Sequence, residues 1–320
     1  MNPSVALLVA YALDRAFGDP PDRFHPVAWM GKAIAVGRDW ALGDLRERVP
    51  RESRRLRVEK VGQLLRGGLV ALLVPTASAL LAYAALRVVG RWPSAVVIAT
   101  GFLLKPTFAV RSLGDAAYVV RDALDQSDLE AARRGLGSLC SRQASALDPR
   151  QLIAATIESV AENTSDSVVA PLFYFACFGL PGAVFYRAVN TLDAMIGYHG
   201  RFEYAGKVAA RIDDLLNLVP ARLTSLLLLG SGLVVGANVR HGVAILVRDG
   251  GQTESPNAGR PMAAMAGLLG VRLAKARHYA LGDELEPPRT MQITKAWRIA
   301  SIASVGAFGV AALVVGVVHG

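Results

Sequence analysis

The sequence has only two cysteines in 320 residues, Cys140 and Cys177, and they lie far apart. This small number excludes a disulfide framework and a cysteine-based zinc site. The five histidines are equally dispersed and show neither H-x3-H nor H-E-x-x-H spacing. Neither residue type therefore predicts zinc binding.

Nucleotide-binding motifs are missing as well. The chain contains no G-x-x-x-x-G-K-[ST] sequence and no strand-bound G-x-G-x-x-G sequence, so a bound nucleotide would be held without a Walker loop. There is no internal repeat and no low-complexity tract, which favours a single domain over residues 1–320.

The net charge of +9 does not come with a basic motif interleaved with aromatic residues, so we expect no nucleic-acid partner. The stretch Arg46–Lys60 is strongly basic, and other polar segments also carry many Arg and Lys residues. By the positive-inside rule these segments lie in the cytoplasm, where anionic lipid headgroups account for the positive charge. The predicted cytoplasmic segments are approximately 18–66, 105–167, 187–222 and 240–298.

Long uncharged runs indicate membrane helices. Three runs are each near the roughly 20 residues that cross hydrocarbon, namely Gly67–Leu86, Leu223–Val239 and Ile299–Val318. The shorter runs Met1–Leu13 and Trp92–Leu104 would cross with snorkelling or local thinning of the bilayer. We expect an all-α, polytopic protein of the cytoplasmic (inner) membrane with about five transmembrane helices, loop helices and a site that faces the cytoplasm.

The first run has no basic n-region and no small-residue cleavage site before Asp14, so it is expected to stay as an anchor. A further run, Val168–Tyr186, is interrupted by Gly179-Leu-Pro181-Gly182. This break predicts a re-entrant hairpin, which would bring the polar segments on either side of it to one face. An ordinary sixth span with a Gly/Pro interruption is the alternative.

The segment ESVAENTSD places three carboxylates directly before that run. Asp148, the proline that follows it and Gln151 read as a helix start. Glu158 and Glu162 then lie one turn apart on one face, and Asp166 continues that face if the helix does. Like charges at this spacing cost a helix a few tenths of a kcal/mol. A divalent cation would remove the repulsion.

Two later segments carry pairs of oxygen ligands. Asn190 and Asp193 are i,i+3 neighbours on a helix, and Asp213 and Asn217 are i,i+4 neighbours. Mg2+ takes such ligands and usually keeps waters and substrate phosphates. Arginines, which can hold phosphate or carboxylate groups bidentately, lie nearby at Arg187, Arg211 and Arg222.

The turn Ser255-Pro-Asn257-Ala-Gly259 precedes a segment rich in Ala, Gly and Met. The turn is expected to cap a helix. Alternatively, Ser255, Asn257 and the free amides at the helix start bind an anionic group. The small residues would let this helix pack closely against a neighbour or a bulky ligand.

Together these motifs resemble the cobalamin-biosynthesis family CobD/CbiB, the adenosylcobinamide-phosphate synthases. The matching segments follow the same order over nearly the whole chain: Gly18-Asp19-Pro20, His25-Pro26-Val27, ESVAENTSD, Tyr186–Tyr198, Ala210–Asp214, SPNAG and His278-Tyr279. The sequence departs from the family pattern at Arg187, where lysine is expected, at Ser167, where glycine is expected, and at Met262, which is often acidic.

The resemblance implies a membrane-bound ligase that joins aminopropanol, or its O-phosphate, to the free propionate of adenosylcobyric acid. ATP would be the co-substrate and Mg2+ the cofactor, and metal-bound carboxylates would neutralise phosphate charge. The corrinoid, membrane lipid and other late membrane enzymes of the pathway are the expected partners. The identity of the amine donor, with ethanolamine as a third option, stays open.

The resemblance also implies residue roles. The expected catalytic residues are Asp19, His25, Glu158, Glu162 and Asp166, of which Asp19 and His25 are candidates for deprotonating the amine. Mg-ATP handling is assigned to Glu158, Glu162, Asp166, Asp193, Asp213 and Asp214. Groups that orient or bind the cofactor and substrate anions are Asn163, Arg187, Asn190, Arg211, Asn217, Ser255 and Asn257.

Two other classes remain open at this point. A Mg-dependent prenyl- or phospho-alcohol transferase would also place carboxylates at a bilayer edge, but it predicts D-D-x-x-D or D-x-x-D-G-x-x-A-R spacing, which Asp213-Asp214 does not complete. An ion-coupled transporter predicts charges in the middle of spans, whereas most charges here lie at span edges or in loops.

Overall fold

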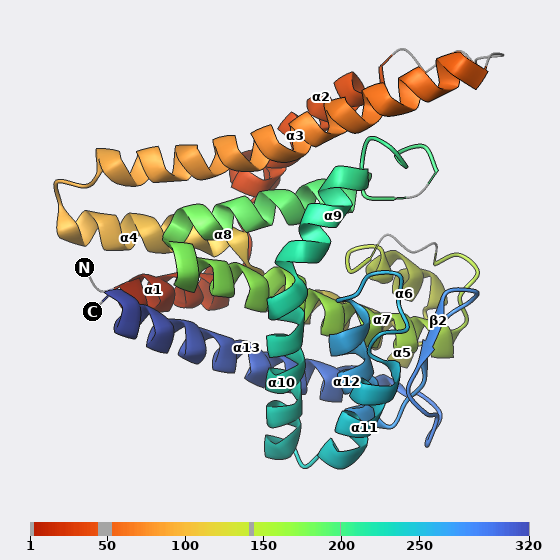
Figure 1. The fold of residues 1–320 in the computed structure, drawn as a ribbon. Helices are drawn as coiled ribbons and strands as arrows, with labels where there is room; N and C mark the ends of the chain where they lie inside the picture. The colour runs from red at the N-terminus through yellow and green to blue at the C-terminus, as the bar shows by residue number, and fades with distance from the viewer. Residues whose placement is uncertain (1–2, 44–52, 141–143, 199, 320) are drawn as a thin grey trace.

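The computed structural model describes residues 3–43, 53–140, 144–198 and 200–319, and this part of the chain is almost entirely helical (Figure 1). Residues 46–52 of the basic stretch Arg46–Lys60 lie outside the described residues, and the rest of the stretch begins α3. The helices are α1 (Pro3–Phe17), α2 (Pro26–Leu42), α3 (Ser53–Val88), α4 (Pro93–Leu104), α5 (Val110–Asp125), α6 (Leu129–Leu136), α7 (Pro149–Thr164), α8 (Ala170–Ile196), α9 (Lys207–Leu216), α10 (Leu218–Val234), α11 (Val239–Asp249), α12 (Gly259–Leu269) and α13 (Thr290–His319).

Short elements complete the fold. Two strands, β1 (Leu273–Lys275) and β2 (Tyr279–Leu281), form an antiparallel hairpin that the all-α expectation did not include. The short helical turns are the 3-10 turns η1 (Asp22–Phe24) and η2 (Lys105–Thr107) and the π-helical turn η3 (Ser165–Val169).

Four helical segments of the described chain are long and apolar enough to cross a membrane, which confirms a polytopic helical protein. They are 58–88, 94–125, 149–196 and 290–317. The predicted spans near Gly67 and Ile299 are therefore present with longer bounds. The run that begins at Trp92 continues through η2 into α5, so residues 105–125, expected in a cytoplasmic segment, extend a candidate span. The N-terminal run forms α1, which has 15 residues.

The predicted break in the run Val168–Tyr186 is present. Gly179 has φ 66° and ψ −161°, a backbone conformation outside the helical region, and it divides α8 into two arms. The arms fold back on each other (Figure 1), and the rings of Tyr174 and Tyr186 stack between them with centroids 5.2 Å apart. Figure 1 shows the second arm returning toward the end of the molecule where α7 begins. The polar residues on both sides of the break therefore share one end of the bundle.

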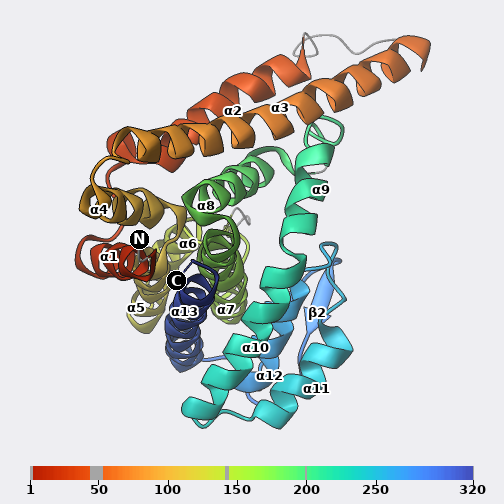
Figure 2. The same cartoon turned by 60° about the vertical axis from the view of Figure 1, so that its left-hand side comes forward.

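The helix α10 runs across the direction of the long helices in both ribbon views (Figures 1 and 2). It passes the criterion for a span only together with α9, from which it is bent by 47°. It ends at Val234 and not at Val239, because Gly236 adopts φ 71° in the turn that follows. The candidate spans of the described chain thus number four, or five if α9 and α10 are one broken span.

The small-residue helix α12 packs closely on α11, as expected. A side chain at Gly267 would overlap the backbone of Gly242 and His241, so only glycine permits this approach. The turn Ser255-Pro-Asn257-Ala-Gly259 precedes α12 as expected, but its side chains do not cap the helix, since Thr253 Oγ1 accepts from the Gly259 amide at 3.0 Å.

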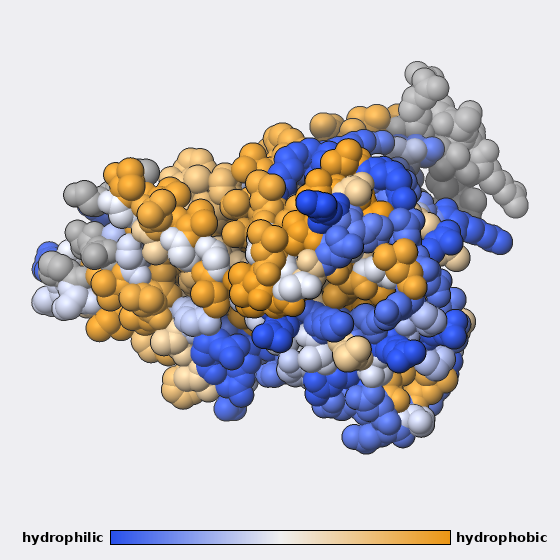
Figure 3. Space-filling model, turned by 90° about the horizontal axis from the view of Figure 1, so that it is seen from below, coloured by the Kyte–Doolittle hydropathy of each residue, from blue (hydrophilic) through white to orange (hydrophobic). Residues whose placement is uncertain are grey.

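Hydrophobic and hydrophilic surface are separated along the molecule. The face seen in Figure 3 is mostly hydrophobic over its left and middle parts and mostly hydrophilic at its right-hand end. The long helices expose large apolar side chains, such as Leu73 and Leu81 on α3 and Leu313 on α13. Such exposure suits contact with lipid and leaves the hydrophilic end for polar chemistry.

Candidate functional site

The carboxylate-bearing helix α7 begins as its sequence predicts. Asp148 and Gln151 form a reciprocal capping box, with the Asp148 side chain accepting from the Gln151 amide at 2.9 Å. At its other end α7 continues through the π-helical turn η3 instead of stopping. Glu162 and Asp166 both line the same cavity. Glu162 and Asp166 therefore share a face as expected, whereas Glu158, predicted on the same face, does not line the cavity.

The cavity lies at the polar end of the bundle and has a volume of about 610 Å³. Seven of its lining residues are acidic and three are Lys or Arg. The acidic set comprises five predicted residues, Glu162, Asp166, Asp193, Asp213 and Asp214, and two that were not predicted, Glu203 and Glu254. Because acidic side chains outnumber basic ones in the lining, the cavity favours a cation among its contents.

Asp213 is held by two of the predicted amides. Asn217 donates from Nδ2 to Asp213 Oδ2 at 2.9 Å, and Asn190 donates to Oδ1 at 3.5 Å. Asn217 is fixed in turn by the hydroxyl of buried Tyr186, which donates to its Oδ1 at 2.8 Å. Asn190 and Asn217 therefore fix the orientation of the Asp213 carboxylate.

The neighbouring carboxylate, Asp214, connects the cavity to the turn before α12. Ser255 Oγ donates to Asp214 Oδ1 at 2.9 Å, and Asn257 Nδ2 donates to the Asp214 carbonyl at 2.6 Å. Arg211 Nη1 lies 3.9 Å from Asp214, and its side chain is 76% exposed. Ser255 thus binds an anionic group that belongs to the protein itself, the Asp214 carboxylate, whereas Asn257 binds the backbone carbonyl of the same residue.

Several predicted residues lie away from the cavity lining. Glu158 is buried and accepts a hydrogen bond from Tyr279 Oη at 3.2 Å. Asn163 donates to the carbonyls of Ser159 and Leu139. Arg187 is close enough to Asp166 for their charges to interact, and it donates to Ser167 Oγ at 3.4 Å.

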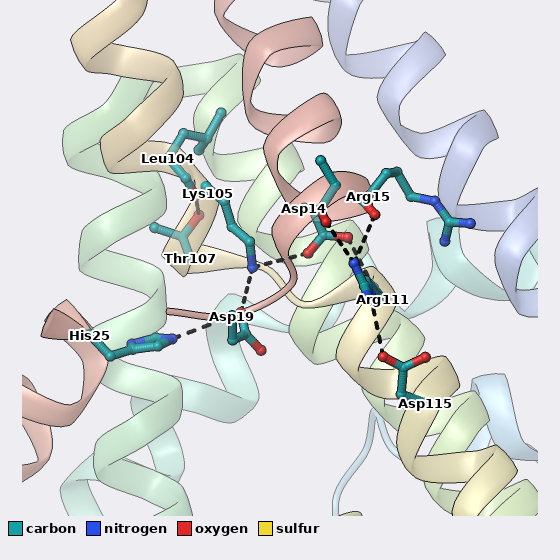
Figure 4. A network of polar contacts seen from close by, with 10 residues as sticks. Asp14, Arg15, Asp19, His25, Leu104, Lys105, Thr107, Arg111 and Asp115 are labelled. Atoms are coloured by element: carbon teal, nitrogen blue, oxygen red, sulfur yellow. Dashed lines mark hydrogen bonds and ion pairs between the residues drawn. The ribbon is translucent and has the colours of Figure 1, made fainter. Parts of the chain in front are cut away.

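Asp19 and His25 do not line the cavity and belong to a separate ionic cluster (Figure 4). At its centre is Lys105, whose ammonium contacts Asp19 and lies 3.0 Å from Asp14. Lys105 and Asp14 are buried, with side chains 6% and 0% exposed. The charge of Asp19 also acts on Arg187, so this cluster borders the residues around the cavity.

The environment of Asp19 decides its protonation. Burial raises the pKa of this carboxyl, but the interactions with His25 and Lys105 outweigh burial and hold the pKa well below its usual range. Asp19 is thus a carboxylate at neutral pH and a weak proton acceptor. His25 caps α2, because its Nδ1 accepts from the Val27 amide at 3.2 Å.

Sequence reasoning missed the cavity's lysines, Lys207 and Lys275, and assigned no role to His278, which also lines it. Lys105 was missed as well. The only sequence signal for Lys105 was a single cation at the end of an apolar run, directly before a proline.

A protein family and several individual proteins match most of this chain. A family model described as CobD/Cbib protein matches residues 7–305. The cobalamin biosynthesis protein CobD of Dehalococcoides mccartyi is 40% identical over 287 residues, which is 89% of each chain. The probable cobalamin biosynthesis protein CobD of Methanothermobacter thermautotrophicus is 37% identical over 304 residues, or 94% of each chain. The CobD protein of Rhodobacter capsulatus is 40% identical over 288 residues, which is 88% of this chain and 84% of the relative.

No solved structure matches the fold. The family match nevertheless extends from α1, which carries Asp14, into α13, so it includes both the cavity and the Lys105 cluster. Its extent, together with relatives of similar length at these identities, shows that the chain belongs to the CobD/CbiB protein family.

Proposed function

We propose that this protein is the amide-forming enzyme of cobalamin biosynthesis expected from its motifs. It would join aminopropanol or its O-phosphate to the free propionate of adenosylcobyric acid and consume ATP. Family membership supports a role as an enzyme of cobalamin biosynthesis. The observation that carries the finer proposal is the cavity, in which carboxylates from α7, η3, α8 and α9 face lysine and arginine side chains.

The proposed reaction needs both the acidic and the basic side chains of the cavity. A propionate oxygen attacks the γ-phosphorus of ATP, the bond to the ADP oxygen breaks, and an acyl phosphate forms. The amine nitrogen then attacks the acyl carbon, inorganic phosphate leaves, and the nitrogen loses a proton. The anionic groups of the substrates would be bound by Lys207, Arg211 and Lys275. The carboxylates of the cavity would face the cation that accompanies the phosphates.

The donor set of the cavity fits Mg2+, since its carboxylates and amides offer oxygen ligands. Among the described residues, no three His, Cys, Asp or Glu side chains are arranged to hold an ion by themselves. One or two of the carboxylates Asp166, Asp193 and Asp213 would therefore hold it together with substrate phosphates and water. When bound, Mg2+ would supply charge neutralisation at the phosphates.

The proposal predicts ATP consumption that depends on two further substrates. Purified protein in detergent or nanodiscs should release ADP and phosphate only when adenosylcobyric acid and an amino alcohol are both present, with amide formed in equal amount. ATP consumption that needs neither would contradict the proposal. Consumption of a prenyl diphosphate would favour the transferase alternative, and ion uptake without ATP would favour a transporter.

We also propose that the cavity faces the cytoplasm from the inner membrane. The carboxylates on both sides of the Gly179 break lie at one end of the bundle, and the turn between α3 and α4 lies at the other (Figure 1). In a variant without Cys140 and Cys177, a cysteine at Glu203 should be shielded from an impermeant thiol reagent added outside intact cells. A cysteine at Arg91, which is exposed in the opposite turn, should be labelled. The reverse pattern would overturn this orientation.

A further inference from the structure

We infer that the β1–β2 hairpin is the phosphate-binding wall of the cavity and that Lys275 is its anion ligand. This inference rests on the proposed function and assigns one phosphate-bearing substrate group to one residue. Lys275 lines the cavity, and the charge interaction between Lys275 and Glu162 acts across it. The ligand is a phosphoryl group, carried either by the nucleotide or by the amino alcohol.

The strand register directs Lys275 toward α7. Lys275 pairs with Tyr279 across the hairpin, and residues directly opposite in an antiparallel pair project to the same face. The hydroxyl of Tyr279 donates to Glu158 Oε2 at 3.2 Å. Since Glu162 follows Glu158 by one helical turn, the face that holds Tyr279 against α7 also places Lys275 beside the carboxylates of the cavity.

The far end of the hairpin is fixed by a buried carboxylate. Asp249 is 2% exposed and accepts from the Gly282 amide at 2.8 Å and from Arg248 Nε at 2.7 Å. The hydrogen bonds from Arg248 lower the pKa of Asp249, so Asp249 is a carboxylate at neutral pH. Arg248 also pairs with Asp283 at 3.0 Å. The hairpin is thus attached at both ends, which holds Lys275 in place before a substrate arrives.

The chemistry of this wall suits phosphate. An ammonium is a compact charge with three donors that can follow phosphate oxygens through small movements. His278, at the end of the same hairpin turn, also lines the cavity, and its Nδ1 is 3.0 Å from Glu254 Oε1. A phosphoryl group between Lys275 and the carboxylates would contact the Lys275 ammonium on one side. On the other side, a bound cation would separate the phosphoryl group from the carboxylates.

The test measures binding directly, without turnover. Lys275→Ala, Lys275→Arg and Arg272→Ala would be compared in detergent for equilibrium binding of Mg-ATP and of aminopropanol O-phosphate. Arg272 is a matched control, because it is exposed beside β1 and does not line the cavity. A lost hydrogen bond to a charged group costs about 1.5–3 kcal/mol, so Lys275→Ala should weaken binding of one ligand by about 10- to 100-fold. Lys275→Arg should keep most of the affinity.

The two ligands distinguish the source of the phosphate. Weaker binding of Mg-ATP alone would assign Lys275 to the nucleotide, and weaker binding of the amine phosphate alone would assign it to the amine donor. Affinities for both ligands equal to those of Arg272→Ala, or no binding of either by the unaltered protein, would overturn the inference. Unaltered protein that binds a phosphate ligand through Lys275 but forms no amide would instead refute the proposed reaction alone.

Discussion

Replacing Glu162 by glutamine or Asp166 by asparagine is expected to abolish amide synthesis while leaving the protein folded. Each change keeps the shape of the side chain and deletes one negative charge from the wall of the cavity. Loss of one charge-stabilising group commonly costs about 10²–10³ in rate. The measurement is the rate of amide formation at saturating corrinoid across a Mg2+ titration, with yield and thermal stability measured on the same samples.

The matched control is Glu130→Gln on α6, which removes a carboxylate that pairs with Arg133 and is 68% exposed. It should retain full activity, because exposed ion pairs contribute little. If Glu162→Gln and Asp166→Asn both keep more than about half of the activity, the catalytic wall must instead be formed by Asp193, Asp213 and Asp214.

Replacing Lys105 by methionine is expected to have the largest effect on stability. The change leaves Asp14, which is 0% exposed, without the ammonium 3.0 Å away. Removing one partner of a buried ion pair typically costs about 3–5 kcal/mol. This loss is a large fraction of the net stability of a typical domain, about 5–15 kcal/mol. The expected result is a low yield of folded protein and a strongly lowered melting temperature in detergent.

A second variant separates charge from shape. Asp14→Asn combined with Lys105→Met removes the uncompensated carboxylate along with its partner, so it should recover part of the stability lost by Lys105→Met alone. A Lys105→Met protein as stable as the unaltered one would show that Asp14 is neutral or otherwise compensated. Equal instability of the single and double variants would assign the loss to packing.

The sequence predicted those features that are determined by residues close together in the chain. The capping box follows from the four residues that begin at Asp148. Glu158 and Glu162 are four positions apart, so any helix through them places both on one face. The break at Gly179 was predictable because glycine permits a positive φ and proline lacks the N–H that continues a helix. The gathering of Asp166 with Asp193 then followed from that break alone.

The parts that were missed depend on residues distant in the sequence. Lys105 meets Asp14 only because α1 packs against α4, and nothing near position 105 reveals a partner 91 positions earlier. The β1–β2 hairpin has strands of three residues, too short for an alternating pattern to be distinguished from a loop. Roles for Lys275 and His278 could not be assigned before their hairpin was placed against α7.

The antiparallel arms on either side of Gly179 constrain how this sequence can change. Asp166 and Asp193 lie before and after the break, so the number of residues in each arm determines which side chains meet at the cavity. One inserted residue in either arm would turn everything beyond it by about 100° around the helix axis. Such an insertion would point one carboxylate away from the other without disturbing the hydrophobic character of the arm. The chemistry of the cavity therefore depends on the length of this apolar hairpin as well as on the charged residues at its ends.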